Sequence, residues 1–250
     1  MSAGRTKVLV EEVLRRLKTV ETASTRQKDT GKREPAVAVY RSFNPALGKK
    51  DIVGALPILQ LGEEAQKHEA LAFHVMKLRD PRFFTFRDSY LLRFPTEAGV
   101  AAFRRLARDA WVDDVQLRLE ASVSPRTLEA GALYAELVQR AYESEAGYRS
   151  AVAAEGLRRT VPPLHTLDWA KVRAVEERSV LVWDVPEWCD GKRLAQEFWW
   201  YSIKNGFQLY SGQGRRLMYV AFGDPADAMR FKRNLHGSHW CGKQILVEKL

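Results

Sequence analysis

The sequence predicts an α+β protein in which two units share one order of strands and helices and are joined by a helical connector. Residues 179–250 read as strand, helix, strand, strand, helix, strand. Residues 36–122 repeat that order less regularly, and a long stretch rich in Ala, Leu and Glu separates the two units. We therefore expect four parts: a basic helical arm and linker (1–35), a degenerate first unit (36–122), a helical connector (123–178) and a second unit (179–250).

The N-terminal arm has a two-sided helical pattern. Apolar residues recur at helical spacing through residues 7–21, and Arg15, Arg16 and Lys18 lie on the opposite side. A helix this short is marginal alone in water, so its apolar stripe should pack on protein while its basic side faces RNA phosphate or solvent. Residues 22–35 are polar and predict a linker, or an arm that orders on binding.

The same N-terminus has features of a mitochondrial targeting segment, because it is amphipathic and carries Arg, Ser and Thr. Glu11, Glu12 and Glu21 count against that interpretation, since such segments are poor in acids. Import into the mitochondrion therefore stays a hypothesis, and a cytoplasmic or nuclear location is the alternative.

The first unit alternates apolar and polar residues in its strands and shows helical spacing between them. The predicted elements are a strand over 36–43, a helix over 56–72, strands over 71–78 and 84–94, a helix over 96–110 and a strand over 115–119.

One junction recurs in both units. A strand ending in Phe94 leads through a short turn into a helix containing Phe103, and a strand ending in Phe222 leads into a helix containing Phe231. We interpret this as an internal repeat, with Phe94 and Phe222 at equivalent core positions.

The connector is predicted to be mostly helical. Residues 124–159 form one long helical pattern, which Ser124 can cap with Pro125 in the first turn. Residues 160–167 are extended, and 168–176 predict one more helix. A connector this structured is unusual for a flexible linker, so we expect it to dock on the two units or on a neighbour.

The second unit resembles the RNA-recognition motif (RRM) family. The resemblance lies in residues 219–222, 234–237 and 242–247, and in a hexamer over 180–185 and an octamer over 215–222. It implies a ferredoxin-like βαββαβ fold whose sheet stacks RNA bases on three aromatic side chains. It also implies which residues contact RNA, or another molecule, on the sheet face: Leu181, Trp183, Arg215, Arg216, Leu217 and Tyr219.

The match at those positions is incomplete. Tyr219 keeps one of the three stacking aromatics, while Leu181 and Leu217 occupy the other two places. Arg215 matches the leading basic residue of the octamer, and Arg216 replaces a glycine. Trp183 shares the face of Leu181 and can partly substitute. Base stacking and protein contact therefore both stay open for this face.

The first unit departs further from the family. With a hexamer over 37–42 and an octamer over 87–94, its three stacking places hold Ala38, Ser89 and Leu91, none of which is aromatic. We expect this sheet not to read bases in the family's manner, and to meet protein or the connector.

The aromatic run 198–201 predicts a protein interface. Leu194, Phe198 and Tyr201 are expected to pack on the sheet, which leaves Trp199 and Trp200 outward, and an outward Trp often marks an interface.

Charge and composition narrow the function classes. The chain has 40 Lys and Arg against 31 Asp and Glu, a net charge of +9, which favours a polyanionic partner such as RNA. No apolar run approaches the roughly 18 residues of a membrane span, so no membrane contact is expected. His236, His239 and Cys241 cluster without a fourth ligand, so we expect no metal site. We also expect no cofactor and no catalysis.

These observations favour a non-catalytic, RNA-associated structural subunit of a large ribonucleoprotein, with RNA and protein subunits as partners. The specific hypothesis is the mitochondrial ribosome. One alternative is an RNA-binding subunit of a mitochondrial RNA-processing or RNA-editing complex. A second is an RRM-derived protein-interaction scaffold without RNA contact.

Overall fold

The computed structural model describes residues 36–56, 69–120, 123–155 and 167–250. The described residues all belong to one compact body within residues 35–250. The predicted arm, with Arg15, Arg16 and Lys18, lies outside the described residues, as does most of the helix predicted over 56–72.

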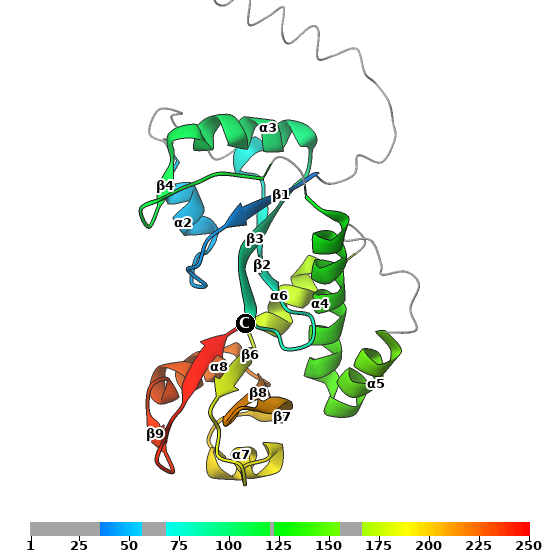
Figure 1. Ribbon diagram of the computed structural model, residues 1–250, viewed down its shortest axis with the longest axis vertical. Coiled ribbons are helices and arrows are strands. Elements are labelled where there is room, and N and C mark those ends of the chain that lie inside the picture. The colour runs from blue at the N-terminus through cyan, green and yellow to red at the C-terminus, as the bar shows by residue number, and fades with distance from the viewer. Residues whose placement is uncertain (1–35, 57–68, 121–122, 156–166) are drawn as a thin grey trace, which may run out of the picture. The chain divides into compact units, whose positions relative to one another are not determined.

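The second predicted unit is a complete βαββαβ fold (Figure 1). Its sheet has the strand order β11-β6-β8-β7, with antiparallel pairing throughout. Its elements are β6 (Ser179–Trp183), α7 (Gly191–Glu197), β7 (Ile203–Gly212), β8 (Arg215–Phe222), α8 (Pro225–Leu235) and β11 (Leu246–Lys249), with a small hairpin of β9 (His239–Trp240) and β10 (Lys243–Gln244) before the last strand. This order of strands is that of an RRM-like, ferredoxin-like fold, as predicted.

Strict alternation gives this sheet two apolar faces. Val180, Val182, Val220 and Phe222 pack under α7 and α8. The residues between them form the opposite face, here called the platform face, which comprises Leu181, Trp183, Phe207, Leu217, Tyr219 and Ala221. The turn between β7 and β8 has positive φ at Gln213 and Gly214, as a tight hairpin turn requires.

The first predicted unit is a reduced copy of the same fold. Its sheet has the order β1-β3-β2 in the described residues, and α3 packs against it. The elements are β1 (Ala36–Arg41), α2 (Lys49–Gly54), β2 (His74–Arg79), β3 (Phe86–Phe94) and α3 (Glu97–Leu106), with 3-10 turns at Glu69–Leu71 and Ala107–Asp109. Helix α2 was not predicted from the sequence, because it is only 6 residues long and buries a single side chain, Ile52.

The strand predicted over 115–119 is largely wrong. Asp113 and Asp114 both have positive φ and make a tight turn, so β4 (Trp111–Val112) and β5 (Val115–Gln116) pair with each other. The chain returns to the sheet only at Leu119, through an isolated bridge to Tyr40. The fourth strand of the fold is thus reduced to one residue pair.

The internal repeat is confirmed at its core. Phe94 at the end of β3 contacts Phe103 of α3, with ring centroids 5.5 Å apart. Phe222 at the end of β8 contacts Phe231 of α8 at 5.2 Å. The two phenylalanines therefore hold equivalent places between sheet and helix.

The connector forms three helices rather than two: α4 (Pro125–Glu143), α5 (Glu145–Glu155) and α6 (Trp169–Glu176). Ser124 caps α4 as predicted, and its hydroxyl oxygen accepts a hydrogen bond from the backbone N–H of Thr127 at 3.2 Å. The long helix breaks at Ser144, whose backbone is extended. No helix in the described residues is both long and apolar enough to cross a membrane.

The connector packs on both sheets, as predicted. Ala132 of α4 joins the buried cluster of Val39, Met76, Leu78 and Leu91 on the first sheet. The next residues of α4, among them Tyr134 and Leu137, are buried on the platform face of the second sheet. One helix therefore covers an apolar face in each unit.

The loop between β2 and β3 completes this packing. Phe84 has φ of 60° and is fully buried, which is unusual for a bulky residue. Its ring lies between Tyr134, Tyr148 and Tyr219, with centroid distances of 5.8, 5.6 and 5.6 Å respectively. A loop of the first unit thus fills the platform face of the second.

Replacing Phe84 with alanine is expected to lower the free energy of unfolding by about 3–5 kcal/mol, because it leaves a cavity among three tyrosines. Urea denaturation measures this. The neighbouring Phe83 is 38% exposed, so Phe83→Ala is the matched control, with an expected cost under about 1 kcal/mol. Equal effects of the two substitutions would show that Phe84 does not join the units.

Candidate nucleic-acid interface

The platform face of the second sheet is covered by the chain itself. Leu181, Leu217 and Tyr219 are almost completely buried. The Tyr219 hydroxyl lies 2.8 Å from the hydroxyl of Ser179, and burial raises the pKa of this phenol well above its ordinary value. The expectation that Tyr219 lies on an outward, accessible face does not hold, because α4, α5 and Phe84 pack over it. The contact that this face makes is with its own connector.

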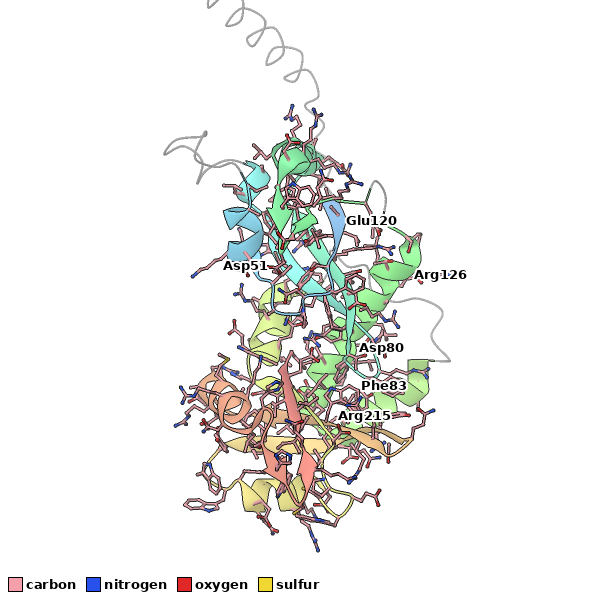
Figure 2. All side chains as sticks on the ribbon, turned by 60° about the vertical axis from the view of Figure 1, so that its left-hand side comes forward. Asp51, Asp80, Phe83, Glu120, Arg126 and Arg215 are labelled. Carbon is pink, nitrogen blue, oxygen red and sulfur yellow. The ribbon has the colours of Figure 1, made fainter. Side chains whose placement is uncertain are left out.

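Trp183 and the two arginines lie at the margin of this face. The guanidinium of Arg215 stands 5.0 Å from the centroid of the Trp183 ring and pairs with Asp184 at 3.1 Å. Arg216 is engaged differently, since it donates to Gln208 Oε1 at 3.1 Å and to the Pro186 carbonyl at 2.5 Å. Arg215, labelled in Figure 2, is the more exposed of the two and keeps hydrogen-bond donors near the surface.

The register of the first sheet corrects the hexamer predicted over 37–42. Val39 stands opposite Leu91, just as Leu181 stands opposite Tyr219. The equivalent hexamer therefore starts one residue later, and Ala38 lies in the core beneath α3. The predicted hexamer was one residue out of register because residues on both faces of β1 are apolar. The corrected position holds Val39, which is not aromatic either.

Trp199 and Trp200 lie where the sequence predicts, with side chains 77% and 55% exposed, while Leu194, Phe198 and Tyr201 are buried. They follow the end of α7 rather than lying within it. Trp188 and Trp240 extend the patch, since Trp240 contacts Trp188 at 5.7 Å and Phe198 at 5.1 Å. We call the four tryptophans the tryptophan surface; sequence reasoning missed two of them, which stand alone in loops and short strands.

A cavity of about 360 Å³ lies between β2 and α6, and sequence reasoning missed it. Its walls carry five side chains that can be cationic: Lys49, His74, Lys77, Arg93 and Arg173. We call it the basic cavity. The available signal was a Lys and an Arg within otherwise apolar strands, at positions 77 and 93.

Burial and mutual repulsion lower the pKa values of cationic side chains that line the basic cavity. Burial lowers the pKa of His74, and the positive charges of Lys49, Arg93 and Arg173 lower it further. Burial also lowers the pKa of Lys49. The pKa of Lys77 falls from 10.5 to about 8, mainly through burial and then through Arg79, although Glu176 and Glu248 oppose the fall. The cavity therefore favours an anion.

The histidine and cysteine cluster is not a ligand set. The described residues contain no group of three His, Cys, Asp or Glu side chains that could hold a metal ion. His236 Nδ1 lies 3.1 Å from the backbone nitrogen of Val247 and so helps to place β11.

Replacing Lys77 with methionine is expected to raise the free energy of unfolding at pH 7 by about 1–3 kcal/mol, because a pKa unit corresponds to about 1.4 kcal/mol. The folded-state pKa lies below the unfolded one, so this cost is fully present below about pH 8 and is lost as the pH rises from about 8 to 10.5. The difference between variant and parent should shrink across that window in urea denaturation.

The exposed Lys50 is the matched control for this prediction, since Lys50→Met removes a charge outside the cavity. Its effect on the free energy of unfolding should be small and should not change across the same window. A constant difference for Lys77→Met would mean that the side chain titrates as it does in the unfolded chain.

Comparison with known proteins gives a family. The family model described as "Protein PET54 N-terminal domain" matches residues 34–139. The chain is 31% identical over 216 residues to Protein PET54 of Saccharomyces bayanus, covering 82% of this chain and 72% of that protein. It is 30% identical over 226 residues to Protein PET54 of Saccharomyces cerevisiae (strain ATCC 204508 / S288c), covering 87% and 76%.

Solved structures of RNA-binding domains are also similar. The three N-terminal RNA-binding domains of the yeast splicing factor Prp24 match at 14% identity and a TM-score of 0.27, covering 86% of this chain and 98% of that one. The third RRM of Mip6 matches at 14% identity and a TM-score of 0.28, covering 30% and 94%. The fold assignment rests on the strand order described above.

The relatives correct one prediction. They are PET54 proteins and not ribosomal proteins, so the hypothesis of a structural subunit of the mitochondrial ribosome is wrong. The RRM-like fold stands, but the sequence family is a different one. The chain belongs to the PET54 protein family.

Proposed function

We propose that this protein is a non-catalytic, RNA-binding subunit of a mitochondrial RNA-processing complex. The observation that carries the proposal is an RRM-like fold in a chain with a net charge of +9. The amphipathic pattern of residues 7–21, with its arginines, supports a role in the mitochondrion.

The covered platform determines how such a protein meets RNA. Because Tyr219 and Leu181 are buried under the connector, bases do not stack on this sheet as they do in the RRM family. Contact then comes from lysine and arginine side chains on phosphates, which supply affinity with little sequence preference.

A non-catalytic role agrees with how the buried titratable groups are used. Tyr134 donates its hydroxyl to Glu176 Oε1 at 2.8 Å, and Tyr219 pairs with Ser179. Burial raises the pKa of the Cys189 thiol to about 11, which disfavours the reactive thiolate. These groups serve packing and hydrogen bonding in the described residues.

The tryptophan surface favours a second contact, with protein. Exposed tryptophans of this size are costly to leave in water and are enriched where proteins bind each other. The surface lies in the segments before and after α7 and on the β9–β10 hairpin, and α7 covers the sheet face opposite the platform face. RNA and a protein partner can therefore bind at the same time, as a subunit of a complex requires.

RNA affinity is expected to fall steeply with salt, with the logarithm of the binding constant dropping by about 0.7 per tenfold salt for each phosphate contacted on a single strand. Fluorescence anisotropy with labelled single-stranded RNA measures this. Tyr219→Leu should cost about 1–3 kcal/mol of stability yet leave affinity unchanged within about twofold, because the ring is covered. A large loss of RNA affinity in a folded Tyr219→Leu protein would show that bases stack on Tyr219 after all.

Replacing both Trp199 and Trp200 with alanine is expected to leave the melting temperature nearly unchanged, since both side chains are exposed, and to remove protein partners from the purified complex. Mass spectrometry of the affinity-purified protein tests this. Phe43→Ala is the matched control, because Phe43 is 84% exposed on the first unit. Retention of every partner by the double variant would contradict the interface.

A further inference from the structure

We propose that the basic cavity binds one nucleotide of an RNA strand, with its phosphate among the cationic side chains and its base against the ring of Trp169. The inference rests on the proposed function, because it takes RNA as the ligand. It names a site away from the stacking positions of the RRM family.

The free polar atoms of the cavity are hydrogen-bond donors. Lysine, arginine and the tryptophan indole have no acceptor atoms. Arg93 Nε and Trp169 Nε1 are buried and have no hydrogen-bond partner within the described part of the chain. A buried donor without a partner costs about 1–3 kcal/mol, so this site calls for a ligand rich in acceptors. Phosphate and base oxygens are such acceptors.

The charges of the cavity are unbalanced. Glu176 is the one side-chain carboxylate among its lining residues in the described ranges, and its Oε1 already accepts the hydroxyl of Tyr134. Arg173 pairs with Glu177 at 3.2 Å. Lys49, Lys77 and Arg93 form no ion pair with a carboxylate of the described residues. These three side chains are left for an anion.

One aromatic ring beside those cations is open to a ligand. The Arg93 guanidinium lies 5.9 Å from the centroid of the half-buried Trp169 ring. Lys49 Nζ lies 5.0 Å from the centroid of the Phe73 ring, but Phe73 is buried in the core and closes the cavity floor. Single-stranded nucleic acids are bound by this combination of charge and aromatic surface, since bases stack on rings while phosphates meet cations.

The place and size of the cavity suit one nucleotide. At about 360 Å³ it falls in the range of small-ligand pockets. It lies along β2, which is an edge strand of the first sheet in the described residues. An acidic peptide would satisfy the charges but would leave the Trp169 ring without a planar partner.

The test uses the full chain and a short, labelled single-stranded RNA of mixed sequence. Arg93→Gln and Lys49→Ala are each expected to weaken binding about 5–10-fold at fixed salt and to reduce the salt slope by about 0.7. Lys50→Ala is the matched control, because Lys50 is the next residue of α2, is exposed and lies outside the cavity. Its affinity should stay within about twofold of the parent.

Lys49 is exposed, so Lys49→Ala keeps the test valid even where Arg93→Gln disturbs the packing of Trp169. Thermal melting of every variant checks the fold. A 5′-mononucleotide added alone should raise the melting temperature of the parent more than that of Lys49→Ala, and should compete with the RNA. If inorganic phosphate raises the melting temperature of the parent as much as the mononucleotide does, the base makes no contact and that part of the proposal is wrong.

Failures of the two proposals are distinguishable. If the parent protein binds no RNA, the proposed function fails. If the parent binds RNA and all three variants bind equally well, only the cavity is wrong. If a polyglutamate peptide stabilises the parent through Lys49 and the mononucleotide does not, the cavity belongs to an acidic protein partner and the inference is overturned.

Discussion

The arrangement of the two units depends on a buried arginine at the end of β2. Arg79 donates from Nη1 to the Phe84 carbonyl at 2.7 Å and to Glu248 Oε1 at 2.9 Å, and from Nη2 to the Lys249 carbonyl at 3.1 Å. Burying a charge is costly unless it is paired and hydrogen-bonded, and removing one partner of such a set is strongly destabilising. The guanidinium therefore ties the β2–β3 loop of the first unit to β11 of the second.

That contact places Phe84 on the platform face and so decides what the face is used for. In the RRM family the equivalent surface meets bases, whereas here it holds the chain together. The apolar side chains at two of the three stacking places agree with this use, since Leu181 and Leu217 pack well under helices. The same residues that remove aromatic stacking thus supply internal packing, and under the proposed function RNA contact would fall to the cationic surface outside the platform.

Much of this fold was predictable because alternation along a strand fixes its faces. The pattern around Phe222 placed Val220 under the helices and Tyr219 on the other side. The pattern does not say what covers a face, because Leu181 and Tyr219 are equally suited to a partner, to RNA and to the chain's own connector. The register of β1 was predicted one residue off, because Ala38 and Val39 are both apolar and either could face the core. The Lys and Arg at positions 77 and 93 stand out within apolar strands, but a single sequence does not show that they lie beside Lys49 and Arg173 in one cavity.

Strand β2 contributes both to the contact between the two units and to the wall of the basic cavity. Lys77 lines the cavity and Arg79, two residues on, reaches β11, while the register of β2 against β3 shifts between them. Leu250 lines the cavity as well, next to the Lys249 carbonyl that Arg79 binds. A ligand that fills the cavity therefore touches the elements that join the units. By mass action such a ligand would stabilise the joined state over any state in which β2 and β11 separate, so the proposed RNA binding would be coupled to the cohesion of the two units.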